Sequence, residues 1–245
     1  MLRQLAPAFR IVLLLTFITG VVYPLLVTGV CQLLFPKQAN GSLIRVGNKI
    51  IGSEIIGQNF TKPEYFHPRP SSAGSGYDGT ASAGSNLGPT SAKLLHGTTK
   101  LDDKKNEVVD FDGLSLRIVH YCIDNGIPYE SSVPLNQFND ASGNLDDVKL
   151  IKAFNNEKAP LVFTPKKPIP ADAVTGSASG LDPHISPANA QMQTVRVAKA
   201  RNVSADQVNR LVAQFTEGPD LGLLGEPRVN VLELNLALDQ QFPRK

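Results

Sequence analysis

An uncharged apolar run near the amino terminus constrains this chain more than any other feature. Residues 11–34 read IVLLLTFITGVVYPLLVTGVCQLL and contain no charged side chain. A helix through residue 36 would be about 39 Å long, whereas the hydrocarbon core of a bilayer is about 30 Å thick. The sequence therefore predicts a transmembrane helix at residues 11–34, with a short segment at residues 1–10 and a body at residues 35–245.

The same run could belong to a cleaved signal peptide or to a lipoprotein leader. Arg3 and Arg10 precede it as in a signal sequence, but the run is too long for a usual signal core and no A-x-A site follows. Cys31 follows Val30, which is not the small residue expected before a lipidated cysteine. These features favour an uncleaved signal anchor.

Small or weakly polar residues recur at every fourth position of the run. Thr16, Gly20, Pro24 and Thr28 therefore share one helix face, on which small side chains let two helix backbones approach closely in lipid. Glycine, proline and threonine are also common in membrane helices generally, so a chance pattern stays open. Pro24 removes one backbone hydrogen bond, which a partner helix or a threonine hydroxyl could help to satisfy. We interpret this line as a candidate packing face.

Charge separates the two sides of the span only weakly. Arg3 and Arg10 precede it, and Lys37, Arg45 and Lys49 follow it, which is close to a tie under the positive-inside rule. A short amino-terminal segment without a long basic cluster after the span favours a cytoplasmic amino terminus. The body is then expected outside the cytoplasm.

Composition limits the function classes open to the body. All 22 acidic residues and all but two of the 24 basic residues follow residue 36, so the body is formally neutral. A nucleic-acid binder needs a concentrated basic face, and we expect none here. Cys31 in the span and Cys122 in the body are not expected to pair, and Cys122 fits a small buried apolar residue. The four histidines lack metal-binding spacing, so no metal site is expected.

The first half of the body carries mixed strand and helix signals. A hairpin is predicted around the Gly-Asn pair at 47–48. Residues 71–91 are rich in Gly, Ser and Ala, and they are either a flexible loop or a loop that orders on a partner. Helices are predicted at residues 114–122 and near residues 145–154, and a short strand within residues 160–170.

The second half carries sharper signals. The Ser-Pro pair at 186–187 predicts the start of a helix that continues to about residue 201. The sequence SADQ at residues 204–207 is a capping box that opens a second helix, which the Gly-Pro pair at 218–219 would end. RVNVLEL at residues 228–234 is interpreted as a strand. The fold class is therefore α+β, with a small sheet and a carboxyl-terminal helical hairpin in a compact body.

Motifs for catalysis are weak. The sequence contains no G-x-x-x-x-G-K-[ST] phosphate loop and no D-K-T-G-T aspartyl-phosphate motif. GSASG at residues 176–180 fails the G-x-S-x-G pattern because Ala178 stands at its centre. A hydrolase would have to use Ser179, Asp182 and His184, whose closeness in sequence is more typical of a turn. We therefore expect no catalytic residues.

Several motifs in order resemble one known family. They are ITGVVYPLL at 18–26, QANGSLI at 38–44, IGQNFT at 56–61, YFHPRPS at 65–71, GSNL at 84–87, SASGLDPHISP at 177–187, RVAKAR at 196–201 and VNVLELNLALD at 229–239. The chain is similar to the C subunit of the Kdp-type potassium-transporting P-type ATPase, over about residues 8–92 and 170–240. Residues 93–169 depart from the family pattern, because an acidic and longer segment stands where the family has a short helical connection.

The resemblance implies a single-span protein of a bacterial or archaeal inner membrane. Its implied partners are a channel-like potassium-selective subunit, a P-type ATP-hydrolysing subunit, a small single-span peptide and membrane lipid. It implies an accessory role in assembly, with potassium handled by the channel-like subunit. It also implies ATP binding and a catalytic-chaperone role that raises the ATP affinity of the pump subunit.

The family motifs also indicate candidate interface residues. These are Gln58, Asn59, Phe60, Tyr65, Phe66, His67, Arg69, Ser179, Asp182, His184, Arg196, Arg201, Asn230, Glu233 and Asn235. The alternative hypothesis is a self-sufficient, signal-anchored envelope protein that acts as a binding module or hydrolase.

Overall fold

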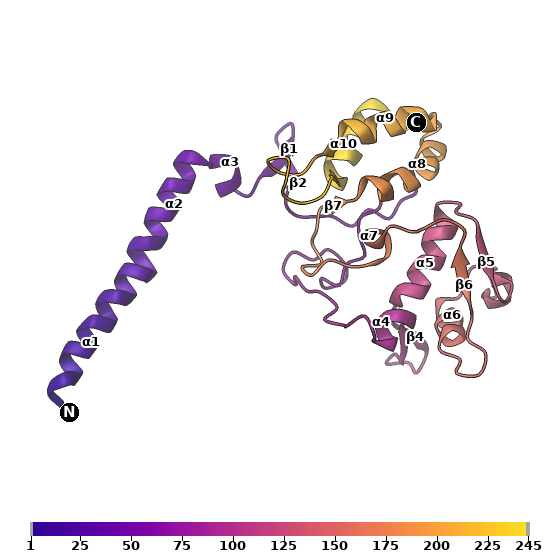
Figure 1. Cartoon of the computed structure of the whole chain (residues 1–245), viewed down its shortest axis with the longest axis horizontal. Helices are drawn as coiled ribbons and strands as arrows, with labels where there is room; N and C mark the ends of the chain where they lie inside the picture. Colours follow the sequence, from indigo (N-terminus) through magenta and orange to yellow (C-terminus); the bar gives the residue numbers. More distant parts are fainter. Residues whose placement is uncertain (1, 244–245) are drawn as a thin grey trace. The chain divides into compact units, whose positions relative to one another are not determined.

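The structure is a computed structural model that describes residues 2–243 of the chain. The chain divides into two compact units, Met1–Ile55 and Ile56–Lys245. Figure 1 shows the helices and strands of both units. The first unit carries the apolar helix and a hairpin, and the second carries the mixed α+β fold.

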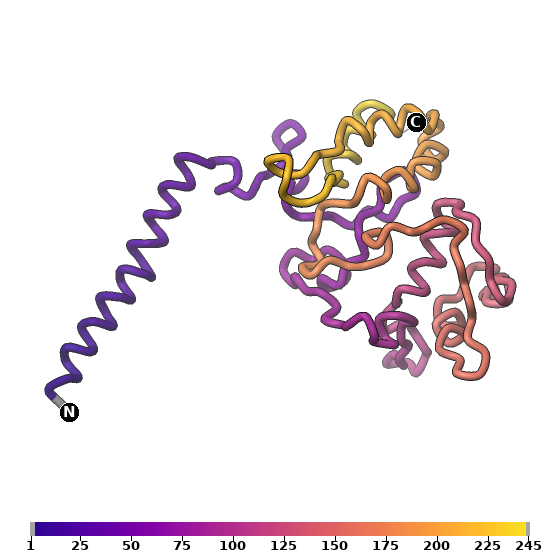
Figure 2. Tube along the Cα trace, in the orientation of Figure 1, coloured from indigo at the N-terminus to yellow at the C-terminus, as the bar shows by residue number. Residues whose placement is uncertain are grey.

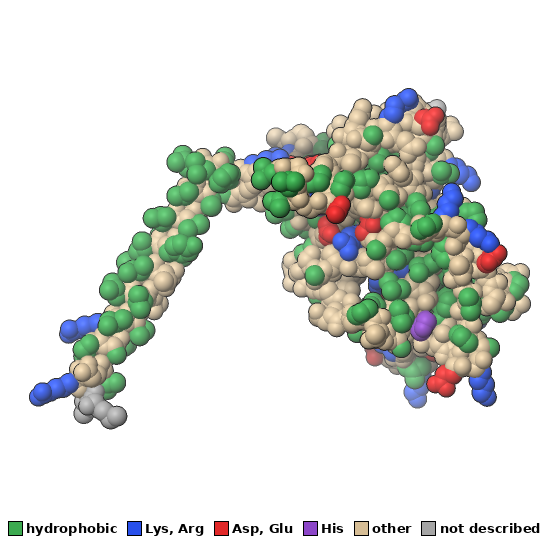
Figure 3. All heavy atoms as spheres, viewed as in Figure 1, with side chains coloured by type: hydrophobic (Ala, Val, Ile, Leu, Met, Phe, Trp, Pro, Cys, Tyr) green, Lys and Arg blue, Asp and Glu red, His purple; other side chains and the backbone are tan. Residues whose placement is uncertain are grey.

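A continuous helix opens the first unit. It consists of α1 (Leu2–Phe17), a π-helical turn η1 (Ile18–Val22) and α2 (Tyr23–Leu34). The predicted helix is confirmed, and it begins before residue 11 because Leu, Ala, Arg and Gln are good helix formers. Apolar side chains cover it along its length (Figure 3). The stretch Arg3–Leu34 is long and apolar enough to cross a membrane.

Pro24 accounts for the wide turn in this helix. A proline inside a helix has no N–H to donate, and its ring clashes with the carbonyl four residues earlier. Tyr23 donates its backbone N–H to the carbonyl of Ile18, five residues back, which is the π-helical spacing. In the preceding turn the Thr19 hydroxyl donates to the Leu15 carbonyl at 2.7 Å. The helix thus widens around the proline and continues.

The predicted hairpin closes the first unit. After the short helix α3 (Pro36–Ala39), strands β1 (Leu43–Val46) and β2 (Lys49–Ser53) pair antiparallel. Gly47 in the turn has a φ of +59°, a backbone conformation that glycine adopts without steric cost. The turn chemistry of the Gly-Asn pair therefore predicted this element correctly.

Two hydrophobic cores organise the second unit. The helical core contains Phe66, Val197, Leu211, Leu234 and further buried apolar residues. It lies among three helices and a three-stranded antiparallel sheet of order β7-β9-β8, which gather at one end of the unit (Figure 1). Its elements are β7 (His184–Ile185), α8 (Pro187–Arg201), α9 (Ala205–Gln214), β8 (Thr216–Glu217), β9 (Arg228–Asn230) and α10 (Val231–Gln241).

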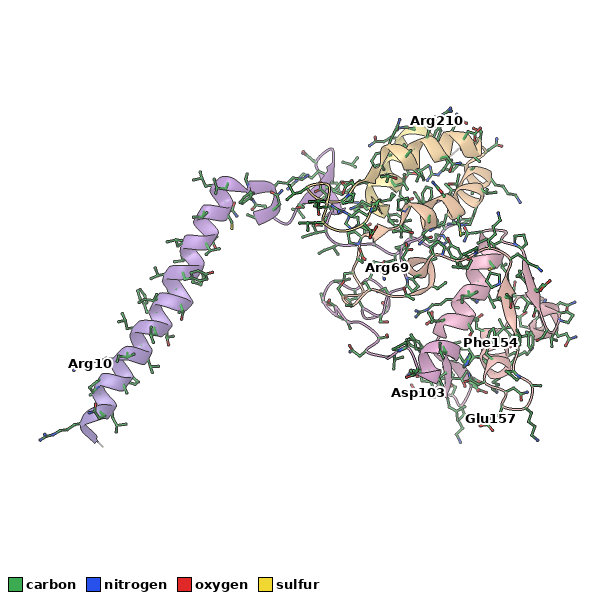
Figure 4. All side chains as sticks on the ribbon, in the orientation of Figure 1. Arg10, Arg69, Asp103, Phe154, Glu157 and Arg210 are labelled. Carbon is green, nitrogen blue, oxygen red and sulfur yellow. The ribbon has the colours of Figure 1, made fainter. Side chains whose placement is uncertain are left out.

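The other core, here called the middle core, is built from residues within the stretch 109–163. Leu116, Val119, Leu150 and Ile151 are buried in it, and Phe154 of α6 joins them (Figure 4). The elements of this part of the chain are α4 (Ala92–His96), β3 (Thr98–Leu101), β4 (Glu107–Phe111), α5 (Gly113–Asp124), β5 (Tyr129–Ser131), η2 (Leu135–Phe138), α6 (Asp147–Phe154), β6 (Phe163–Pro165) and α7 (Ala171–Val174). The predicted helices α5 and α6 and the strand β6 are confirmed.

The helical hairpin of α8 and α9 is also confirmed. Ser186 caps α8 by accepting from Asn189 N–H at 3.1 Å, and Ser204 and Gln207 form the capping box of α9. The end of α9 was predicted wrongly. The helix stops at Gln214, well before the Gly-Pro pair at 218–219, because β8 then pairs with β9.

The predicted strand at residues 228–234 is wrong beyond Asn230. The side-chain oxygen of Asn230 accepts hydrogen bonds from the N–H groups of Leu232 at 3.1 Å and Glu233 at 3.2 Å. Those two groups would otherwise lack a partner at the start of a helix, so Asn230 ends β9 and caps α10. Local alternation in the sequence could not reveal this change.

Because Asn230 is 5% exposed, losing this cap should destabilise the second unit measurably. We expect Asn230→Ala to lower the free energy of unfolding by about 1–2 kcal/mol. Urea unfolding of the full chain in detergent micelles, followed by circular dichroism, measures this. Asn136→Ala, at an exposed asparagine, should change stability by less than about 0.5 kcal/mol. Equal effects of both variants would contradict the capping role.

Candidate functional site

The residues predicted from the family motifs meet around one extended stretch, here called the proline-rich segment (residues 62–70). Asn235 of α10 accepts from the N–H of Phe66 at 2.8 Å and donates to its carbonyl at 3.0 Å. Both residues are almost fully buried. A single side-chain amide therefore satisfies both backbone groups of Phe66, as a neighbouring strand would in a sheet.

Gln193 of α8 does the same for the next residue. Its Oε1 accepts from the N–H of His67 at 2.7 Å, and its Nε2 donates to the His67 carbonyl at 3.1 Å. The same Nε2 also donates to Asn189 Oδ1 at 2.9 Å. Prolines at positions 63, 68 and 70 exclude regular helix or an inner strand here. Side chains must therefore supply the hydrogen bonds.

Arg196 extends this network along the segment. Its guanidinium donates to the carbonyls of Pro63 at 2.8 Å and Tyr65 at 2.9 Å, and to Asn125 Oδ1 at 3.0 Å. A further contact of 3.2 Å joins it to Nε2 of His67. Burial and the neighbouring Arg196 charge lower the pKa of His67, which favours a neutral imidazole. The site thus holds one cationic side chain against carbonyl oxygens.

Arg201 holds the start of the same segment. Only 1% of its side chain is exposed, and it donates to the Glu64 carbonyl at 2.7 Å and to Asp239 Oδ1 at 2.9 Å. The Tyr65 hydroxyl donates to the other Asp239 oxygen at 2.8 Å, while the guanidinium lies 5.0 Å from the Tyr65 ring centroid. Charge pairing, hydrogen bonding and ring stacking therefore fix the segment to α8 and α10.

Arg69 forms a second centre at the other end of the segment (Figure 4). It contacts Asp182 at 2.9 Å and donates to the carbonyls of Thr175 at 3.3 Å and Gly176 at 3.2 Å. Burial opposes ionisation of Asp182, but hydrogen bonds from His184 and the charge and hydrogen bond of Arg69 together lower its pKa. The carboxylate is therefore charged and joins residues distant in sequence.

Residues 71–91 are ordered against the chain itself. Figure 2 shows this purple stretch running beside the orange stretch before α8. Ser71 Oγ donates to the Gly180 carbonyl at 2.6 Å, and Ser82 Oγ donates to the Ser179 carbonyl at 2.9 Å. The structure shows neither of the two alternatives left open by the sequence, because the loop packs on the body of its own chain.

The serine candidates of a hydrolase make local turn contacts. Ser179 Oγ accepts from the Leu181 N–H at 3.1 Å, and the nearest contact between the ring of His184 and Asp182 measures 3.6 Å. Within residues 2–243, no hydrogen bond joins Ser179 to His184. The same residues contain no group of three His, Cys, Asp or Glu side chains that could hold a metal ion. Cys122 is free and buried, as predicted.

The remaining predicted residues surround this network or lie on the first unit. Phe60 packs on the helical core, with its ring centroid 5.3 Å from that of Tyr65. Asn59 lines the groove described below, Gln58 lies half-buried before it, and Glu233 stands in the first turn of α10. The network uses nine of the candidates: Tyr65, Phe66, His67, Arg69, Asp182, His184, Arg196, Arg201 and Asn235.

The predicted packing face of the helix is exposed in this chain. All four residues of the face, Thr16, Gly20, Pro24 and Thr28, are exposed, and a Cβ on Gly20 would meet nothing within 4 Å. In a regular α-helix, residues four apart drift by about 40° per step. The wider π turn takes up part of that drift. The four residues thus lie closer to one line than an uninterrupted α-helix allows.

Sequence reasoning missed a groove beside the proline-rich segment. The groove has a volume of about 520 Å³ and lies between residues 59–77 and α5, and its lining includes Asn59, Tyr77, Leu116, Arg117, His120 and Tyr121.

Tyr121 also joins the polar network, because it donates to Asn189 Oδ1 at 2.8 Å. Asn189 and Gln193 stand four residues apart on the buried face of α8. Polar residues at that spacing on a helix were the signal that could have indicated the network.

Comparison with known proteins gives one consistent result. The family described as "K+-transporting ATPase, c chain" (KdpC) matches residues 5–110 and 135–240. A "Potassium-transporting ATPase KdpC subunit" of Mycobacterium tuberculosis is 45% identical over 98% of this chain and all of its own length. The same-named subunits of Rhodospirillum rubrum and Beijerinckia indica are 44% and 41% identical over 99% of this chain, and over 98% and 96% of their own lengths. The family model leaves residues 111–134 unmatched, whereas it matches residues 93–110 and 135–169 of the stretch that the sequence analysis describes as departing from the family pattern.

Removing the amide of Gln193 should destabilise the second unit. We expect Gln193→Leu to cost about 2–4 kcal/mol, because the part-buried N–H and carbonyl of His67 lose their partner. The free energy of unfolding of the full chain in micelles measures this. Gln191→Leu, on the exposed face of the same helix, is the matched control and should stay within about 0.5 kcal/mol. Similar losses for both would rule out the network as the cause.

His120 should make stability depend on pH. A hydrogen bond of 2.7 Å to Asp147 raises the pKa of His120 more than burial lowers it, and Asp124 and Asp112 add to the rise. A raised folded-state pKa stabilises the fold below the unfolded-state pKa, and this gain is lost as pH rises through the folded-state pKa. Thermal unfolding should therefore show that His120→Gln lowers Tm more at pH 5.5 than at pH 8. Asp147→Asn should weaken the same pH dependence, and a pH-independent effect of His120→Gln would contradict this.

Proposed function

This chain belongs to the family of the K+-transporting ATPase c chain, and from that premise we propose that it is a non-catalytic, membrane-anchored subunit that stabilises an ATP-driven potassium-import complex. The family shows that the chain is a subunit of the K+-transporting ATPase. The proposal adds how the chain contributes, which is by packing against its partners and not by chemistry of its own.

The exposed helix carries this proposal. From Leu2 to Leu34 the chain forms one helix whose described side chains are almost all exposed. Its apolar surface suits lipid, and the line through Gly20 and Pro24 suits close contact with another helix. We assign that contact to the channel-like, potassium-selective subunit. The P-type ATP-hydrolysing subunit and the small single-span peptide are the other proposed partners.

The body supports a structural role because its motif residues hold the body together. Arg69, Arg196 and Arg201 all bond to backbone carbonyls or carboxylates of the same chain. Such a rigid body can present a fixed surface to a partner with little loss of conformational entropy on binding. In the proposed topology the amino terminus is cytoplasmic and the body lies outside the cytoplasm. Potassium is then handled by the channel-like subunit.

The effect on ATP is proposed to be indirect. A body outside the cytoplasm is separated from cytoplasmic ATP by the bilayer. A rise in the ATP affinity of the pump subunit must then pass through the membrane helices of the complex, as a coupling free energy between two distinct sites. The helix of this chain is the part that crosses the membrane and can contribute to that coupling.

A bulky side chain on the proposed packing face should weaken assembly. We expect Gly20→Leu to reduce co-purification of the channel-like and ATP-hydrolysing subunits at least about fivefold in mild detergent, because helix backbones could no longer meet. The amount of each subunit recovered with the tagged chain, measured by mass spectrometry, reports this. Potassium-dependent ATP hydrolysis by the same membranes should fall with it.

Gly29→Leu is the matched control. A Cβ on Gly29 would also meet nothing within 4 Å, but Gly29 lies about 100° around the helix from Thr28. It should assemble normally. If Gly20→Leu assembles and transports like the unsubstituted chain, this helix face is the wrong one. If the tagged chain is recovered alone although the partners are expressed, the subunit role fails as well.

A further inference from the structure

Three leucines project from the second unit without any contact that would explain them. They lie in the loop between β8 and β9, here called the leucine loop (residues 219–227). Leu221 is 91% exposed, Leu223 is 88% exposed and Leu224 is 61% exposed. Leucine side chains that stand this far into solvent in one short loop are unfavourable unless something apolar covers them.

The leucine loop has a fixed conformation. The backbones of Asp220 and Leu224 exchange hydrogen bonds of 2.8 and 2.9 Å, and Gly222 donates to Pro219 at 3.0 Å. Leu221 is held at a φ of +53°, which costs energy for a residue with a Cβ. The hydrogen bonds therefore hold the leucines outward and do not let them fold back onto the body.

Charged residues lie at the base of the loop and are absent from its tip. Arg228 contacts Asp220 at 3.1 Å and Glu217 at 3.2 Å. Residues 221–225 at the tip are therefore leucine and glycine only, while Glu226 and the paired charges of Arg228, Asp220 and Glu217 lie at the base. This separation of an apolar tip from a polar base is the arrangement that suits the boundary between lipid tails and headgroups.

The composition of the tip favours lipid over a protein partner. Energetically dominant residues at protein interfaces are mostly Trp, Tyr and Arg, and leucine is under-represented among them. Leucine is one of the side chains that enter hydrocarbon most readily. The leucine loop is also too small to provide the broad, complementary area that a specific protein contact needs.

The covalent connection keeps the second unit close to the bilayer. Glu54 donates its backbone N–H to the Ser42 carbonyl at 3.0 Å, so the hairpin adds no length between Leu34 and Ile56. The effective tether is residues 35–42, which at about 3.5 Å per extended residue reaches at most about 28 Å. This tether limits how far the start of the second unit can lie from the carboxyl end of the helix.

We propose that Leu221, Leu223 and Leu224 insert into the leaflet from which the body emerges. The leucine loop is then a second lipid contact of this chain, besides the apolar helix. It restricts rotation of the body about its tether and fixes one side of the body against the membrane surface. This inference depends on the anchor and the loop, and it holds or fails independently of the proposed partners.

Tryptophan fluorescence tests this directly, because the chain contains no tryptophan. The full chain carrying Leu223→Trp is reconstituted into phosphatidylcholine vesicles, with and without lipids brominated near the headgroup end of their chains. We expect at least twofold quenching and a blue-shifted emission. The matched control is Leu101→Trp, at a leucine that is 67% exposed and flanked by Lys100 and Asp102. It should show neither effect.

Equal, weak quenching of both variants would overturn the proposal. A blue shift of Leu223→Trp that occurs only when partner subunits are present, without quenching by brominated lipid, would also overturn it and assign the loop to a protein contact. Thermal melting in the same vesicles, followed by circular dichroism, checks that both variants are folded. Because both substitutions are at exposed positions, we expect Tm to change by no more than about 2 °C.

Discussion

Backbone hydrogen bonding in the proline-rich segment is the constraint on which the rest of the second unit depends. Phe66 must be buried to complete the helical core, yet the nearby prolines prevent the segment from joining a sheet. Buried N–H and carbonyl groups without partners would cost about 1–3 kcal/mol each. Asn235 and Gln193 remove this cost with two side-chain amides. The positions of α8 and α10 relative to the segment follow from that requirement.

The same network also connects the two cores. Tyr121 and Asn125, at the end of α5, bond to Asn189 and Arg196 of α8. The middle core has its own buried apolar cluster, but its longest helix is joined by polar contacts to the network that holds the proline-rich segment. Burying polar groups in this way is favourable because within residues 2–243 every buried side-chain polar atom has a partner.

Local chemistry allowed much of the fold to be predicted from the sequence. The Ser-Pro start of α8, the capping box of α9 and the Gly-Asn hairpin turn each depend on neighbouring residues, and all three are confirmed. The strand predicted past Asn230 failed because alternating apolar residues fit a strand and a buried helix equally well over seven positions. The pairing of Asn235 with Phe66 spans 169 residues, and no local pattern carries such information. Family motifs identified part of this network, such as Arg196 and Asn235, but not Gln193, and all the contacts came only from the structure.

The chain order of the network has a consequence for biosynthesis. The proline-rich segment leaves the ribosome early, whereas Asn235 and Asp239, which bond to it, belong to the last helix of the chain. Until those residues have been synthesised, the backbone of Phe66 has only water as a partner. The body of this protein therefore completes its fold only after nearly the whole chain has been synthesised. A polypeptide that is cut short within α10 is left with an open core and becomes a substrate for proteases.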